Sequence, residues 1–146
     1  MRLRLLLTIS VLTVLSCSSC TVKTSLISEK LDKVESLLTS EPDSALLLIE
    51  GIDLETIHKE KIKARHALLY SIIMDKRHVD IKSDSLIRPA LEYYPRHGDC
   101  QETAMTFYYT ARIYENADDL ELAMKYLVKA ESIRSNKDPY LNSLIH

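Results

Sequence analysis

The chain contains very little glycine and no tryptophan, and tyrosine is almost its only aromatic residue. Its 146 residues include two glycines, one phenylalanine and three cysteines. The phosphate-binding loops of P-loop and dinucleotide-binding enzymes need several glycines close together, so both classes of nucleotide enzyme are excluded. Sandwiches and barrels need frequent tight turns and β-branched runs, which this composition does not supply. The composition therefore predicts an all-helical protein.

The chain also has no large excess of charge of either sign. It carries 19 Lys and Arg residues against 21 Asp and Glu residues, which gives a formal net charge of -2. A nucleic-acid-binding domain usually shows a strongly basic patch or an overall basic composition. We therefore expect no nucleic-acid partner.

The first residues have the features of a secretion signal. Arg2 and Arg4 form a short positive segment, and residues 5–15 are mostly apolar and carry no charge. This stretch is too short to span a bilayer, which takes about 20 residues, but it has the usual length of the apolar core of a signal peptide. We therefore predict a signal peptide at residues 1–16 and exclude it from the fold.

The residues that follow the apolar stretch resemble the lipobox of bacterial lipoproteins. Val14-Leu15-Ser16-Cys17 places a small residue directly before a cysteine. In that family the signal is cleaved before the cysteine, which then receives a lipid, so the resemblance implies lipidation of Cys17. Cys20 fits the pattern less well, and cleavage without lipidation is the alternative. A lipidated chain would be tethered to the membrane through a polar segment, residues 17–25.

From Leu26 onwards, apolar residues recur at the spacing of helices. One stripe lies on a first predicted helix that ends before Pro42, and it consists of Ile27, Leu31, Val34 and Leu38. Pro42 suits the first turn of a second helix, and Gly51 suits its C-terminal cap. The apolar run Ala45–Ile49 is predicted to be buried. Together the two segments predict a helical hairpin.

Two more helices are predicted between residues 55 and 98. The third runs from about Glu55 to Lys76, and its charge-rich segment, residues 58–66, is expected to be a solvated face. Its other face offers small residues and a few apolar ones for close helix packing: Ala64, Ala67, Leu68, Ser71 and Ile72. The fourth begins near Ser83 or Asp84 and ends at Gly98. Pro89 lies inside it, so this helix either starts late or is kinked there.

The segment from Ala104 to Lys137 carries the most specific pattern. Two helices are predicted to meet at residues 116–119, and large residues alternate with small ones at fixed offsets: Phe107, Ala111, Tyr114, Ala123, Leu127 and Ala130. This pattern resembles the tetratricopeptide repeat, a helix-turn-helix unit of 34 residues. The segment departs from the family pattern at Thr110, where an aliphatic residue is usual, and at Ser135, where proline is usual.

The resemblance implies a fold for the whole of residues 26–146. We expect an all-α domain of antiparallel helical hairpins, stacked as a short right-handed solenoid, with its clearest repeat at residues 104–137. The order of its segments resembles the N-terminal region of tetratricopeptide-repeat proteins common in Bacteroidetes. Residues 138–146 look like the first turns of another helix, so we expect the domain to be incomplete at its C-terminal end.

Motifs that carry catalysis are missing. The sequence contains no HExxH, no Ser-x-x-Lys and no Gly-x-Ser-x-Gly, and its Cys and His residues do not have metal-ligand spacing. We therefore expect no enzymatic activity, no cofactor and no metal site. His97 and Cys100 come closest to a reactive site, because a helix N-terminus can activate a nearby thiol. Two ligands do not make a zinc site, so we expect an unreactive cysteine beside a loop histidine.

The functional candidate is a protein-binding face. If the first helices of successive repeats line a concave surface, they would present Tyr108, Arg112 and Glu115 to a peptide. Aromatic and arginine side chains supply much of the binding energy at protein interfaces. We therefore predict partner binding at these three residues, and we expect Tyr114 and at least half of the other tyrosines to serve in packing.

Together these observations predict a non-catalytic protein–protein interaction module in the bacterial cell envelope. The resemblance to lipoproteins implies that the module is held by lipid at Cys17, on the periplasmic side or in the outer membrane, and that its partner is a protein or peptide. One alternative is a truncated sensor or regulatory domain of a tetratricopeptide-repeat signalling protein. Another is a glycan-capturing helical lipoprotein, which the lack of tryptophan disfavours.

Overall fold

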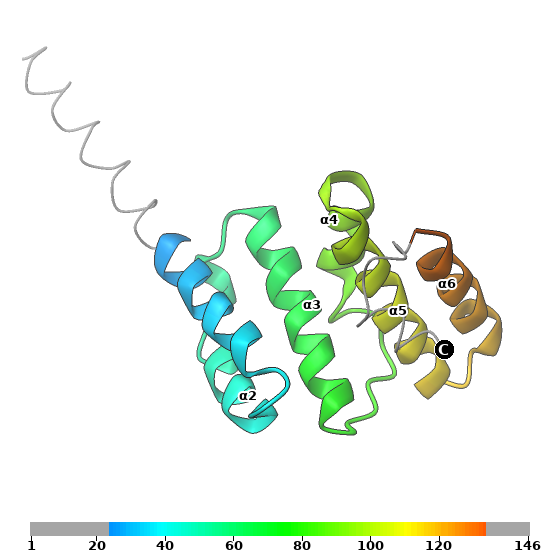
Figure 1. Ribbon diagram of the computed structural model, residues 1–146, viewed down its shortest axis with the longest axis horizontal. Coiled ribbons are helices and arrows are strands. Elements are labelled where there is room, and N and C mark those ends of the chain that lie inside the picture. The colour runs from blue at the N-terminus through cyan, green and yellow to red at the C-terminus, as the bar shows by residue number, and fades with distance from the viewer. Residues whose placement is uncertain (1–23, 134–146) are drawn as a thin grey trace, which may run out of the picture.

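The protein is described here by a computed structural model, in which residues 24–133 are placed and form helices with no strand in that range (Figure 1). The predicted all-α fold class is therefore confirmed for this range. The described elements are a first helix at residues 24–37, α2 (Pro42–Glu50), a 3-10 turn η1 (Leu54–Thr56), α3 (Glu60–Lys76), α4 (Arg88–His97), α5 (Cys100–Asn116) and α6 (Leu120–Ile133). The predicted signal peptide, Cys17 and residues 134–146 lie outside the described residues.

Neighbouring helices in the sequence are also neighbours in space. The structure packs α2 against α3, α3 against α4, α4 against α5 and α5 against α6, and α3 also touches α5. Figure 1 shows them side by side from the first helix and α2 at one end to α5 and α6 at the other. Buried apolar residues from the first helix through α6 form one continuous core. The alternate helices α3 and α5 are therefore in direct contact, which positions the site described below.

The first helix follows its predicted stripe but extends further than expected. Leu31 and Val34 are fully buried, as predicted. The helix already includes residues 24 and 25, which the sequence analysis assigns to the polar tether. The helix ends at residue 37, and a turn leads to Pro42, which lies in the first turn of α2 as predicted.

The predicted burial of the run Ala45–Ile49 is wrong in its middle. Ala45 and Ile49 are fully buried, whereas Leu47 is 74% exposed and Leu48 is also exposed. The reason is that α2 packs on one side only, and Leu47, two positions from both Ala45 and Ile49, points away from the contact. An apolar run in a short helix therefore does not require that every face be covered.

The next two helices begin later than predicted. The chain makes the turn η1 first, where the Asp53 carboxylate accepts a hydrogen bond from the Glu55 N–H at 3.0 Å, and α3 then begins at Glu60 instead of Glu55. The predicted close-packing face of α3 is buried throughout. The helix α4 starts at Arg88, so Pro89 lies in its first turn and the late start is the correct alternative. Gly98 ends α4 as predicted.

The last two helices meet where the sequence predicts. Asp99 starts α5 through a capping box, in which its carboxylate accepts from the Glu102 N–H at 2.8 Å and the Glu102 carboxylate accepts from the Asp99 N–H at 3.2 Å. Between α5 and α6, Ala111 and Ala130 are buried and permit a close approach of the two helices.

Candidate functional site

A cleft of ≈ 390 Å³ lies between the first helix, α3 and the beginning of α5. We call it the groove, and it includes side chains from all three of these helices and Tyr94 from α4. Its floor is apolar and is made by Leu68, Ile72, Tyr94 and Met105, while charged and polar side chains surround it. An apolar floor with a polar rim is the usual composition of a binding cleft.

The α3 side of the groove results from regular spacing. Lys61, Arg65, Leu68 and Ile72 are separated by four, three and four residues, so they lie along one face of this helix, and all four line the groove. The face changes from charged to apolar along its length. This face was not predicted from the sequence, although the spacing of its residues is a signal that the sequence contains.

Arg65 connects two walls of the groove. Its guanidinium donates to the Asp32 carboxylate at 2.6 Å and to the Glu35 carboxylate, and both acids lie on the first helix. Burial disfavours the charged guanidinium, but the hydrogen bonds to Glu35 and Asp32 outweigh this effect and raise its pKa above the ordinary value. The expectation of a solvated face at residues 58–66 is therefore wrong at Arg65.

His66, the last residue of that expected solvated face, is buried on the other side of α3. Its Nε2 lies 3.4 Å from the Ile49 carbonyl oxygen at the end of α2. Burial lowers the pKa of the imidazole below its ordinary value, and the hydrogen bond to Ile49 partly opposes this change. The histidine therefore joins α3 to α2 and does not face the groove.

The α5 side of the groove includes Gln101 and Met105, which lie on the same face of α5 as two of the predicted binding residues. Tyr108 comes three residues after Met105 and Arg112 four residues after Tyr108, so they continue this face beyond the groove. Arg112 donates to the Asp75 carboxylate of α3 at 3.0 Å and also pairs with Glu115. This contact closes the space between α3 and α5 at that end.

The three predicted partner-binding residues differ in exposure. Tyr108 is only 9% exposed, Arg112 is partly buried by its ion pairs, and Glu115 is exposed. Tyr108 and Tyr109 pack edge to face with their ring centroids 5.1 Å apart. None of the three residues lines the groove, and their role in binding a partner stays a prediction.

The segment from His97 to Cys100 does not form a metal-type cluster. The His97 ring packs on the Tyr93 ring with centroids 5.0 Å apart, and the thiol of Cys100 is exposed at the start of α5. Within residues 24–133, no three His, Cys, Asp or Glu side chains lie close enough to hold a metal ion.

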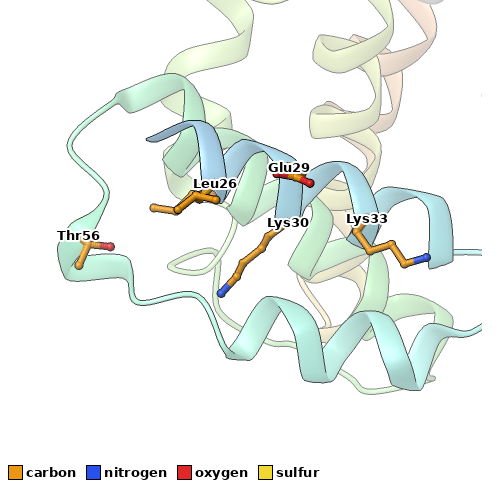
Figure 2. Close-up of a pocket in the computed structure, with 6 residues that line it drawn as sticks. Leu26, Glu29, Lys30, Lys33 and Thr56 are labelled. Carbon is orange, nitrogen blue, oxygen red and sulfur yellow. The ribbon is translucent and has the colours of Figure 1, made fainter. Parts of the chain in front are cut away.

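A second cleft, of ≈ 470 Å³, opens between the first helix and η1. Figure 2 shows Leu26 extending from the first helix towards the turn that carries Thr56, with Lys30 pointing into the open space. Its other charged residues are Glu29 and Lys33, and all three charged side chains are exposed. This cleft is bounded by two walls, whereas the groove has three helices around it. The groove is therefore the better candidate site.

No helix among the described residues is long and apolar enough to cross a membrane. Comparisons of the chain with protein-family models, with curated proteins and with solved structures found no match. The function is therefore argued from the groove and its residues.

Proposed function

We propose that the protein is a non-catalytic interaction module of the tetratricopeptide type, which holds a peptide segment of a partner protein in the groove. The observation that carries this proposal is the arrangement of the groove itself. Alternate helices of the chain supply its walls, and they present an apolar floor beneath a rim that carries both acidic and basic groups. Such a surface can bury the apolar side chains of a peptide and pair with its polar backbone and charges.

The contacts around the groove suit a rigid receptor. Arg65 holds the first helix against α3, and Arg112 holds α3 against α5. Both walls are therefore fixed by contacts that exist without a ligand. A preformed site loses less conformational entropy on binding than one that must be ordered by its ligand.

The chemistry of the rim indicates what the peptide contains. Lys61 is exposed on α3, whereas Arg65 is occupied by two carboxylates. Across the groove, Gln101 is exposed on α5 and can donate and accept hydrogen bonds. A peptide with an apolar anchor for the Met105 floor and a carboxylate near Lys61 matches this distribution.

The proposal extends to the repeat architecture and to the anchor. The helical pairs of α3 with α4 and α5 with α6, together with the residue spacing at 104–137, support a short tetratricopeptide-like solenoid. The sequence Leu15-Ser16-Cys17 supports a lipid at Cys17 that would hold the module in the cell envelope.

A site-specific cross-link tests the binding site. A photoreactive benzoylphenylalanine replaces Gln101 in the groove or, as a matched control, Glu92, which is exposed on α4 and does not line the groove. We expect a discrete cross-linked partner from position 101 and none from position 92. Equal cross-linking at both positions, or none at 101 when the protein is present at normal level, would contradict the proposal.

A cysteine substitution tests the anchor separately. We expect Cys17→Ser to abolish metabolic labelling with palmitate and to leave the precursor uncleaved, because lipidation precedes cleavage in bacterial lipoproteins. Cys20→Ser is the control, and it should be labelled and processed normally. Labelling that is lost with Cys20→Ser and kept with Cys17→Ser would assign the lipid to Cys20 instead.

A further inference from the structure

The outer side of α6 carries three large apolar side chains without cover from the described part of the chain. Leu120, Met124 and Val128 are 69%, 61% and 58% exposed. They are spaced by four residues and so form one line along the helix, which we call the α6 stripe. Ala123 and Ala130, on another side of the same helix, are buried against the core. An exposed apolar line of this kind marks an interaction surface.

The two edges of the α6 stripe differ in charge. On one edge stand Glu121 and Lys125, both of which are exposed. Neither forms an ion pair with another described residue. The opposite edge carries Ala123 and Leu127, which are uncharged and more buried, and its next charge is the exposed Glu131, one turn beyond Leu127. An occupant that covers residues 120–128 should therefore offer complementary charges on one side only.

We propose that the α6 stripe pairs with the α6 stripe of a second copy of this chain, in an antiparallel arrangement with twofold symmetry. The twofold axis passes at the level of Met124, so the two Met124 side chains meet and Leu120 faces Val128 of the second copy. Spacing by four residues forms the ridges that interdigitate in the commonest class of helix packing. The same surface then serves both copies, as an isologous interface requires.

Charge complementarity selects the antiparallel arrangement. A twofold axis perpendicular to both helices keeps the charged edge of one copy beside the charged edge of the other. With a rise of about 1.5 Å per residue, Glu121 then lies within about 3 Å, along the helix axis, of Lys125 of the second copy. The symmetry produces this pair twice. A parallel pairing instead places the charged edge beside Ala123 and Leu127, where it meets no charge.

The interface is small and therefore reversible. It consists of three apolar side chains from each copy and two charge pairs in all, which is below the size of a permanent dimer interface. The pairing should accordingly be detected by a method that traps a weak complex. Cysteine cross-linking in the full-length protein, in membranes of the expressing bacteria, meets this requirement.

The cross-linking test uses Cys20→Ser/Cys100→Ser as background and copper phenanthroline as the oxidant, which accepts the two electrons of each thiol pair while the two protons pass to the solvent. Met124→Cys in this background should give a disulfide-linked dimer, because the twofold axis brings the two positions together. Leu120→Cys should give none, because its two copies lie about 12 Å apart along the axis and a disulfide needs Cα atoms about 4–7 Å apart. Coexpressed Leu120→Cys and Val128→Cys should cross-link.

The results divide clearly. Dimers from Leu120→Cys alone would overturn the antiparallel arrangement. The absence of a dimer from Met124→Cys would overturn the proposal. This holds whether the Met124→Cys thiol reacts with a maleimide, as in a monomer, or is protected by residues 134–146 or by another protein. The background chain without the new cysteine is the control for Cys17.

A charge exchange tests the register. Glu121→Lys should reduce the yield of the Met124→Cys dimer by about fivefold, since it replaces two exposed ion pairs with repulsion. The double variant Glu121→Lys/Lys125→Glu should restore the yield. Failure of the double variant to recover would remove the proposed charge pairs and with them the argument for this partner.

Discussion

Polar contacts add to the shared apolar core in the first half of the molecule, whereas aromatic contacts add to it between α5 and α6. Around α3, the first helix is held by Arg65, and α2 is held by an Arg77–Asp43 ion pair with an N···O distance of 2.7 Å and by the buried His66. Between α5 and α6, Phe107 and Tyr114 both pack on Tyr126, with centroids 6.0 and 5.6 Å away. The polar contacts leave an open groove, and the aromatic contacts fill the space between the helices.

The difference indicates which contacts mainly stabilise the domain and which mainly shape the groove. Large buried side chains contribute several kcal/mol each, while exposed ion pairs contribute about 1 kcal/mol or less. Removal of the buried Phe107 ring should therefore cost more stability than removal of any one ion pair. The ion pairs should mainly set the position of the first helix relative to α3, and so the shape of the groove.

The largest expected effect comes from the aromatic side. Phe107→Ala removes a buried ring that contacts Tyr126 and lies under the Lys129 ammonium, 5.3 Å from the ring centroid. We expect a loss of about 3 kcal/mol in the free energy of unfolding, measured by urea denaturation. Phe107→Leu should recover most of it. A loss below that of Arg65→Met would reverse the comparison.

The two glycines allow a second comparison, because Gly98 ends α4 in a crowded position and Gly51 ends α2 in an open one. A Cβ at Gly98 would lie 2.6 Å from Cδ1 of Tyr94 and 3.0 Å from its carbonyl oxygen, and Tyr94 is buried. Gly98→Ala should therefore cost about 1–3 kcal/mol. At Gly51 the nearest atoms are 3.5 Å away, so Gly51→Ala should be neutral or slightly stabilising. Equal melting temperatures for both variants would refute this reading of the α4 end.

A smaller effect is expected on the polar side. Arg65→Met keeps much of the side-chain volume but removes both ion pairs to the first helix. We expect a loss of about 1 kcal/mol or less, because both carboxylates are well exposed, and the loss should shrink at high salt. Lys63→Met, which removes an ion pair within α3 alone, is the control and should cost only a few tenths of a kcal/mol. A loss that does not depend on salt would indicate packing instead of charge.

The smallest effect concerns pH. Burial lowers the pKa of His66 in the folded state, so below its unfolded pKa of about 6.5 the unfolded chain binds a proton that the folded chain does not. The free energy of unfolding should therefore decrease as pH falls through about 6.5, and no such contribution exists above it. The hydrogen bond to the Ile49 carbonyl opposes the lowering and limits the effect.

His66→Gln provides the comparison for that pH effect, because glutamine can donate to the same carbonyl and does not titrate. The melting temperature of the original chain should fall more between pH 7.5 and pH 5.5 than that of the variant. Equal decreases would assign the pH dependence to the other groups of the chain.

Local features could be predicted from the sequence, and distant contacts could not. Pro42, Gly98 and the meeting point at residues 116–119 depend on neighbours within a few positions, and each was predicted correctly. Arg65 and Asp32 are 33 positions apart, so their ion pair depends on how two helices pack. Periodicity shows which residues share a face, but it does not show whether another helix covers that face.

Tyr108 and the groove illustrate that limit. The spacing of α5 correctly groups Tyr108 with Arg112, yet Asp75 of α3 closes this end of the face and Tyr108 is buried. The open part of the same face lies nearer the start of α5, at Gln101 and Met105. The sequence could therefore predict the kind of site but not its open end.

The central claim, that the partner lies against the first helix, α3 and α5, is tested most directly by hydrogen exchange. The partner captured at position 101 would be purified and added to the unmodified protein, and amide exchange would be measured helix by helix. The account predicts slower exchange at residues 24–37, in α3 and at the beginning of α5, with no change in α2 and α6. Slower exchange in α2 or α6, with none around the groove, would contradict it.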